Sequence, residues 1–181
     1  MIKTVKRILL SILIISIFLL LTFSILTHLY PRKYAEYVTE FSKEYSLNEN
    51  LVYAIIKCES NFKHSSLSHA EAYGLMQITA STFEWAKKLR KEDDKISIYD
   101  PRTNIDYGCY IFSYLYNEFS NTETALAAYN AGRGKVKSWL SNPEYSADNK
   151  TLTNIPFSET KNYIQKVKNT KLIYDLLYRG K

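Results

Sequence analysis

The sequence predicts a mostly α-helical protein in which one membrane-spanning helix precedes a single folded domain. Only 5 glycines and 4 prolines occur in 181 residues, too few for the many turns of an all-β sandwich. Apolar residues recur at helical spacing along most of the chain, and no strand-like alternation exceeds a few residues. The length suits one domain, and 46% hydrophobic residues exclude an intrinsically disordered chain.

The first element is an uncharged apolar run of 19 residues from Ile8 to Leu26. As a helix it is about 28 Å long, close to the thickness of the hydrocarbon core of a bilayer. No A-x-A-like pair of small residues follows it, which argues against a cleaved signal peptide. Three basic residues precede it, so the positive-inside rule places the N-terminus in the cytoplasm. We therefore expect a cytoplasmic segment 1–7, a transmembrane signal anchor 8–26, a linker 27–33 and an extracytoplasmic domain 34–181.

The first half of the domain shows three helical patterns. Apolar residues from Tyr34 to Tyr45 predict a short amphipathic helix. Ser46 and Glu49 match the S-x-x-E pattern of a capping box, which predicts a second helix running to about Glu59. Loops are predicted at 61–71 and 91–95, and between them a turn at Gly74 precedes a third helical pattern that runs to Arg90.

The second half continues in the same way. Asp100-Pro101 precedes a periodic helix ending near Phe119, and Ala125–Ala131 predicts a short helix closed by Gly132 and Gly134. One or two helical turns surround Trp139, and the polar segment 142–156 predicts an irregular excursion. Ser158 is the expected N-cap of the last helix, which either continues or breaks before Leu172.

Charge and composition restrict the ligands. Two cysteines and three scattered histidines give no metal-ligand spacing, so no metal site is predicted. The net charge is +6, but no basic stripe or nucleic-acid-binding motif is present. The late lysines Lys161, Lys166, Lys168 and Lys171 are typical of a solvated helix face. We expect no nucleic-acid partner.

Glu59 is the first candidate catalytic residue. It follows Ile55, Ile56 and Cys58 near the C-terminal end of a predicted helix, where the helix dipole is negative. Both surroundings disfavour the ionised carboxylate and raise its pKa. A carboxylic acid that is still protonated near neutral pH is what glycosidic cleavage requires of a general acid. From position alone, a solvated glutamate that ends a helix is the simpler interpretation.

Four short strings, taken together, favour the catalytic interpretation. They resemble the lytic transglycosylases of the soluble-lytic-transglycosylase (SLT) type, which have a goose-type lysozyme-like fold. The resemblance extends from about residue 46 to residue 167. Each string alone is weak evidence, but four in this order are specific. The strings are KCESNF at 57–62, AYGLMQI at 72–78, AAYNAG at 127–132 and ETKNYIQKV at 159–167.

The resemblance implies a membrane-anchored enzyme that cleaves the MurNAc-β-1,4-GlcNAc bond of peptidoglycan and leaves 1,6-anhydroMurNAc ends. Glu59 is implied as both acid and base, and no metal or organic cofactor is implied. Peptidoglycan strands and the bacterial membrane, with cell-wall machinery proteins, are the implied partners. The implied substrate-binding residues are Ser60, Met76, Gln77, Tyr129, Asn130 and, from the last helix, Tyr163.

Two alternatives to this function stay open. Most glycosidases use two carboxylates, whereas none of Glu71, Asp106 and Glu159 stands where the family has a nucleophile. The resemblance therefore implies assistance by the acetamido group of the substrate. A hydrolytic muramidase acting on the same bond is one alternative, and a catalytically silent wall-binding module is the other.

The chain also departs from its relatives in places. Glu71-Ala72 stands where relatives often have Gly-Ala, and a proline that often follows the GLMQ string is missing. Cys58 and Cys109 lie on helices that the resemblance packs together, so a disulfide and two separate buried thiols are both open interpretations.

Overall fold

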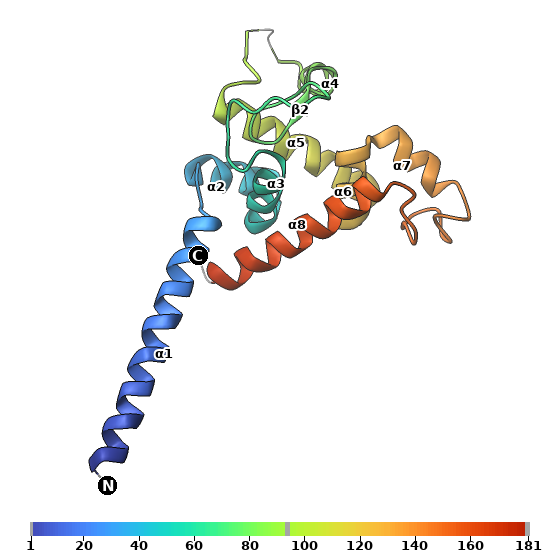
Figure 1. The fold of residues 1–181 in the computed structure, drawn as a ribbon. Helices are drawn as coiled ribbons and strands as arrows, with labels where there is room; N and C mark the ends of the chain where they lie inside the picture. Colours follow the sequence, from blue (N-terminus) through green and yellow to red (C-terminus); the bar gives the residue numbers. More distant parts are fainter. Residues whose placement is uncertain (1, 93–94, 180–181) are drawn as a thin grey trace.

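The computed structural model describes residues 2–92 and 95–179. In this part of the chain a long N-terminal helix projects from a helical domain that carries one small β-hairpin (Figure 1). The prediction of a mostly α-helical protein is confirmed. The elements are α1 (Ile2–Leu29), α2 (Ala35–Glu44), α3 (Glu49–Ser60), β1 (Ala72–Tyr73), β2 (Ile78–Thr79), α4 (Ala80–Arg90), α5 (Pro101–Phe119), α6 (Thr122–Ala131), α7 (Arg133–Leu140) and α8 (Ser158–Leu177).

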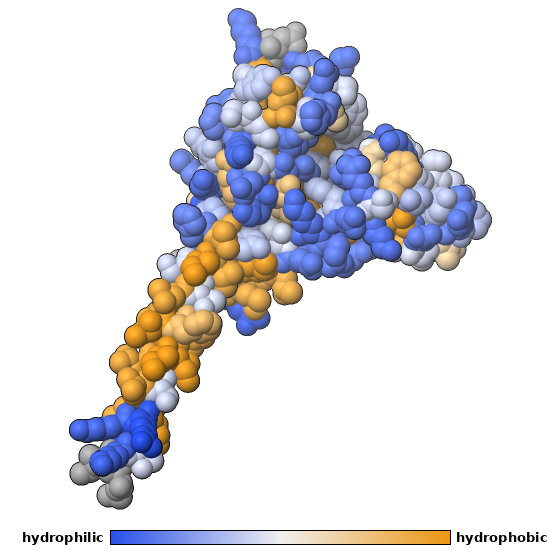
Figure 2. Space-filling model, viewed as in Figure 1, coloured by the Kyte–Doolittle hydropathy of each residue, from blue (hydrophilic) through white to orange (hydrophobic). Residues whose placement is uncertain are grey.

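Helix α1 has the length and composition of a membrane span over Lys3–Leu29. Its side chains form an apolar surface that ends in a hydrophilic cluster near the N-terminus (Figure 2). The helix is longer at both ends than the expected anchor 8–26, and it includes part of the expected linker 27–33. The boundaries of the cytoplasmic segment, anchor and domain stay predictions, and their terminal residues 1, 180 and 181 lie outside the described ranges.

Helix α3 forms the centre of the domain. Its six consecutive residues from Leu51 to Ile56 are all buried, as expected for a helix that is covered on every side. It packs against α8 along one flank and against α2 along another, while α5 packs against α2, α4 and α6. The catalytic candidate Glu59 thus lies at the end of the most enclosed helix.

Two expected helix starts are wrong. Asn48, not Ser46, caps α3, because its side-chain oxygen accepts a hydrogen bond from the backbone N–H of Leu51 at 3.0 Å. Glu49 is the first helical residue, and its carboxylate binds Arg32 and Thr39 instead of closing a capping box. At α8 the N-cap position is Phe157, without a side-chain cap, and Ser158 is already helical.

Most other local expectations are confirmed. Asp100 caps α5 through the backbone N–H of Thr103 at 2.8 Å, and Gly132 ends α6 with φ of +96°. Gly134 instead lies inside α7, and α8 continues unbroken past Leu172. The segments 61–71 and 142–156 are largely irregular. Residues 93–94 of the expected loop 91–95 lie outside the described ranges.

The two cysteines are separate thiols, so the disulfide interpretation is wrong. Cys58 points at α8, where its sulfur lies 3.6 Å from the hydroxyl of Thr170. Cys109 is fully buried on α5. The packing of α3 against α8 directs Cys58 to a different neighbour, so the two sulfurs do not meet.

Candidate active site

Glu59 is held between α3 and α8. The hydroxyl of Tyr163 on α8 donates a hydrogen bond to its Oε1 at 2.6 Å. Burial raises the pKa of Glu59 to about 7, although the hydrogen bond from Tyr163 and the positive charge of Lys166 both lower it. The expected rise in pKa is therefore present, and the carboxyl is both proton donor and proton acceptor near neutral pH.

Tyr163 remains protonated beside this carboxyl. Burial and the negative charge of Glu59 raise the pKa of Tyr163 well above its ordinary value. The same two causes raise the pKa of Tyr129, which lies at the end of α6. Both phenols therefore act as hydrogen-bond donors across the neutral pH range.

Tyr129 and Asn130 connect α6 to the turn between β1 and β2 and to α8. The hydroxyl of Tyr129 donates to the backbone oxygen of Met76 at 2.8 Å. The side-chain oxygen of Asn130 accepts from the hydroxyl of Thr160 on α8 at 2.8 Å. This bond fixes the amide of Asn130, whose NH2 group has no partner among the described residues.

The turn between β1 and β2 forms the opposite wall. Gln77 has φ of +49°, and its side-chain amide donates to the backbone oxygen of Gly74 at 2.9 Å and of Ser66 at 3.2 Å. Ser60 donates to the backbone oxygen of Leu75 at 2.8 Å and so ties α3 to this turn. Both side chains hold the backbone of the wall in place.

The side chain of Met76 anchors this wall in the core. It is fully buried, and a Cβ added to Gly108 would lie 2.2 Å from its sulfur. At position 108 of α5, only glycine leaves room for the side chain of Met76. In this structure the carbonyl of Met76, rather than its side chain, faces Tyr129.

Asn104 is a supporting residue that sequence reasoning missed. It is fully buried on α5, accepts from the backbone N–H of Met76 at 2.8 Å, and donates to the backbone oxygens of Tyr73 and Ile98 at 3.0 and 2.9 Å. Gly74, with φ of +76°, makes room for it, because an added Cβ would lie 2.3 Å from its Nδ2. The sequence signal was a polar residue on the same helix face as Gly108 and Ile111.

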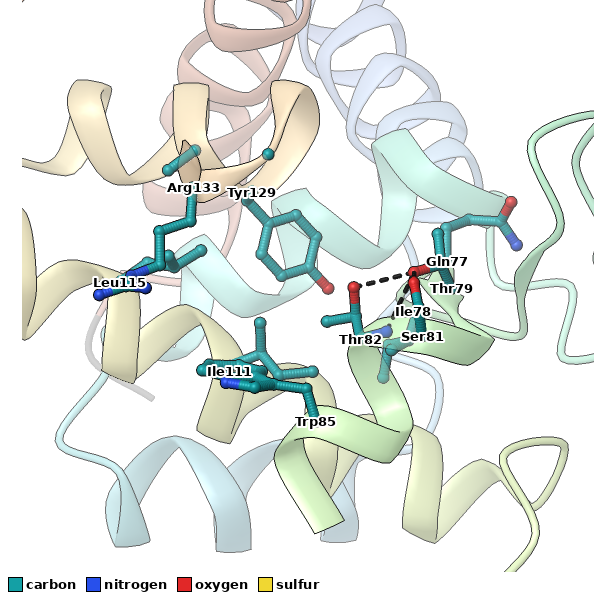
Figure 3. Close-up of a pocket in the computed structure, with 12 residues that line it drawn as sticks. Gln77, Ile78, Thr79, Ser81, Thr82, Trp85, Ile111, Leu115, Tyr129 and Arg133 are labelled. Carbon is teal, nitrogen blue, oxygen red and sulfur yellow. Dashed lines mark hydrogen bonds between the residues drawn. The ribbon is translucent and has the colours of Figure 1, made fainter. Parts of the chain in front are cut away.

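A cavity of about 290 Å³ is lined by residues of β2, α4, α5 and α6, together with Gln77 (Figure 3). Tyr129 and Gln77 line this cavity and also belong to the walls around Glu59, whereas Glu59 itself does not line it, so the cavity is adjacent to the carboxyl. Trp85 and Arg133 at its edge were not foreseen. The lining residues are Gln77, Ile78, Thr79, Ser81, Thr82, Trp85, Ile111, Leu115, Ala128, Tyr129, Gly132 and Arg133.

The backbone at Glu71 explains why a glycine suits this position. Its φ is +53°, in the left-handed region that glycine adopts without strain. The glycine that relatives often carry therefore suits this position better than glutamate does.

Within the described ranges, no group of three or more His, Cys, Asp or Glu side chains could hold a metal ion.

Comparison with known proteins agrees with this geometry. The Transglycosylase SLT domain model matches residues 36–152. The chain is 34% identical over 155 residues to the soluble lytic murein transglycosylase of Salmonella typhimurium, an alignment that covers 83% of this chain and 23% of that protein. It is 30% identical to the membrane-bound lytic murein transglycosylase C of Cronobacter sakazakii, over 78% of this chain and 46% of that protein.

The fold is also that of a solved relative. An inactive glutamate-to-glutamine mutant of lytic transglycosylase Slt from Pseudomonas aeruginosa superposes with a TM-score of 0.71 at 27% identity, over 81% of this chain and 24% of that one. The helical fold with a carboxyl at the end of its central helix places the domain in the lysozyme-like class. The chain belongs to the transglycosylase SLT domain family. It spans less than half the length of these relatives.

Proposed function

We propose that this chain is a membrane-anchored lytic transglycosylase that cleaves the MurNAc-β-1,4-GlcNAc bond of peptidoglycan and forms 1,6-anhydroMurNAc ends. The observation that carries the proposal is the partly buried carboxyl of Glu59 beside Tyr163, whose pKa of about 7 suits a single acid–base group. The inactive Pseudomonas mutant, which replaces a glutamate with glutamine, supports an essential glutamate in this family.

In the first step Glu59 acts as the acid. Its protonated form gives a proton to the glycosidic oxygen, and the bond from C1 of MurNAc to that oxygen breaks. The acetamido oxygen of the same MurNAc stabilises the cationic centre at C1. The amide NH2 of Asn130, fixed by Thr160, is available to orient the acetamido group.

In the second step Glu59 acts as the base. Now ionised, it removes the proton from the C6 hydroxyl of MurNAc, and that oxygen closes onto C1. The hydrogen bond from Tyr163 stabilises the carboxylate between the two steps, and burial favours its return to the protonated form. The acid is therefore regenerated without a second residue.

The other carboxylates considered from the sequence do not serve as a partner. Asp106 accepts hydrogen bonds from Tyr45 at 2.6 Å and Arg90 at 2.9 Å, in a cluster joining α2, α4 and α5. Glu71 and Glu159 are exposed. A single carboxyl supports substrate assistance over the two-carboxylate mechanism.

The cavity beside Gln77 and Tyr129 is the proposed place for a neighbouring sugar ring. Its walls combine the apolar side chains of Ile111 and Leu115 with hydroxyls from β2 and α4, a mixture suited to a saccharide. Helix α1 would hold the domain at the outer face of the bacterial membrane, single-pass, because three basic residues at its N-terminal end precede its apolar run.

Digestion of purified peptidoglycan by the detergent-solubilised full chain tests the proposal, with mass spectrometry of the products. We expect anhydro-ended muropeptides from the wild type and none from the Glu59→Gln variant. Products heavier by one water would instead identify a hydrolytic muramidase. Binding of peptidoglycan without any cleavage would identify a silent wall-binding module.

A further inference from the structure

We propose that the C-terminal half of α8 lies on the bilayer surface and is a second membrane contact of this protein. The inference rests on the proposed insertion of α1 in the membrane. The surface concerned, the α8 membrane patch, consists of Leu172, Ile173, Leu176 and Leu177.

The patch is an apolar surface on a helix that is otherwise polar outside. Leu172 and Leu176 are each 58% exposed, and they lie one turn apart on the same face. In the first half of α8 the exposed positions are polar, as at Lys161 and Gln165. With the half-buried Ile173 and Leu177 they form a contiguous exposed apolar surface, the kind of surface that marks a contact site.

The patch lies where the proposed membrane span ends. The hydroxyl of Tyr174 donates to the backbone oxygen of Pro31 at 3.0 Å, and that of Tyr178 donates to the backbone oxygen of Tyr30 at 2.8 Å. The rings of Tyr30 and Tyr174 also meet edge to face at 5.9 Å. Leu172 and Leu176 lie two residues before and after Tyr174 on the opposite, exposed face of α8, so the part of α8 that carries them is attached to the end of α1. Figure 2 shows the apolar surface of α8 adjoining that of α1.

The depth of this junction suits a contact with lipid. The apolar run of α1 ends at Leu26, and Tyr30 lies about 6 Å further along the helix direction. The headgroup layer on each side of the hydrocarbon core is about 5–8 Å thick. The segment of α8 that Tyr174 and Tyr178 join to Tyr30 and Pro31 therefore lies near that layer, where tyrosine rings are common and leucines reach the acyl chains.

Charge favours a lipid surface over a second copy of the chain. Exposed Lys33 and Arg179 follow two residues after Pro31 and Leu177, and the ammonium of Lys57 lies 5.4 Å from the ring centre of Tyr30. Phosphate groups of anionic lipids attract such a basic rim. Two copies meeting through the same rim would repel each other.

This contact sets the height of the active site. Tyr163, the partner of Glu59, lies nine residues before Leu172 on the same helix, a distance of about 14 Å. With one end of α8 fixed by Leu172 and Leu176, the carboxyl is held at a defined height above the lipid.

Spin labels on the full chain, reconstituted in phosphatidylethanolamine and phosphatidylglycerol vesicles, test the inference. Cysteines at Leu176 (the patch), Gln165 (the control) and Leu19 (within α1) are introduced in a Cys58→Ala background, while Cys109 is buried and unreactive. Gln165 is the matched control, because eleven residues place it on the same face of α8. Collisions with oxygen and with a water-soluble nickel chelate are compared.

We expect the Leu176 label to be protected from the chelate and accessible to oxygen, and the Gln165 label to behave as in water. Leu172→Asp should restore chelate access at position 176, whereas Leu67→Asp, at a leucine that is 59% exposed elsewhere, should not. Free chelate access at 176 overturns the inference, and the Leu19 label then shows whether α1 insertion failed as well. Protection from both probes with spin–spin broadening would assign the patch to a second copy and also overturn it.

Discussion

The two walls of the active site are built in different ways. One wall is the pair of packed helices α3 and α8, which carry Glu59 and Tyr163. The other is an irregular turn whose backbone includes left-handed residues and whose shape depends on Asn104 and Gly74. The difference indicates that Glu59, the proposed proton-transferring group, is fixed by the core, whereas the turn proposed to face the sugar can change without rebuilding the core.

This contrast has an energetic side. The helix wall draws on the many apolar contacts of residues 51–56, so no single contact decides its position. The turn is held by a few hydrogen bonds to the buried side-chain amide of Asn104, so one substitution can displace it. Variants in each wall should therefore behave differently, and the four below are ordered from the largest expected effect to the smallest.

Glu59→Gln, in the helix wall, should lower turnover by at least about 10³-fold while leaving the fold intact, because it removes the only proposed proton donor. It should also change how stability depends on pH. The pKa of Glu59 rises from 4.5 to about 7 on folding. As pH rises through that range, the free energy of unfolding of the wild type therefore falls by about 3 kcal/mol relative to that of the variant.

Urea unfolding in detergent at pH 4 and pH 8 measures this difference, with Glu36→Gln on the exposed side of α2 as the control for loss of one charge. At pH 8 the stability of the Glu59→Gln variant should be higher, relative to the wild type, than it is at pH 4. Substantial glycan cleavage by a folded Glu59→Gln protein would remove Glu59 from the mechanism.

Asn104→Ala, in the turn wall, should lower the free energy of unfolding by roughly 2–4 kcal/mol, because it leaves the buried N–H of Met76 without a partner. Turnover should fall as well, since Gln77 moves with the turn. Denaturant unfolding and muropeptide release measure both effects. Asn117→Ala, at an exposed position of the same helix, is the matched control, and equal behaviour of the two variants would contradict the supporting role.

Tyr163→Phe should slow turnover about tenfold, the scale of one hydrogen bond to a charged group. Because this bond lowers the pKa of Glu59, its loss should raise that pKa and move the alkaline limb of the activity profile to higher pH. Initial rates between pH 5 and pH 9 show the shift. Tyr116→Phe, at an exposed tyrosine of α5, should leave the profile in place; a shift to lower pH for Tyr163→Phe would contradict the assignment.

Thr160→Val should have the smallest effect, a loss of a few-fold in turnover, because it frees the amide of Asn130 without removing it. Asn130→Ala should cost more than Thr160→Val and less than Glu59→Gln. Neither should move the pH profile. The three rates, measured on the same peptidoglycan, test whether Thr160 acts through Asn130.

Helix positions were largely predictable from sequence, because apolar spacing reflects which face meets the core. The start of α3 was not, since Ser46 and Glu49 match a local pattern that competes with Asn48, and Glu49 is engaged by Arg32 and Thr39 instead. A local pattern cannot show which distant partner a side chain will take.

In the candidate site, too, features set by local sequence were predictable and those set by contacts between distant residues were not. The raised pKa of Glu59 was expected from its apolar neighbours, which are local features, and burial is what raises it in the structure. The roles of Asn104 and Thr160 depend on contacts across 28 and 30 residues, to Met76 and Asn130, and no periodicity reveals them. Their identification required the fold.

The placement of the two tryptophans gives the protein an optical property. Trp85 lines the cavity and meets Tyr114 edge to face, whereas Trp139, on α7, packs against Phe157 and does not line the cavity. A saccharide that displaces water from the indole of Trp85 should shift its fluorescence to shorter wavelength, while Trp139 gives a constant background. Replacing Trp139 with Phe would leave one emitter at the cavity, so that occupancy could be followed by light during turnover, without a label.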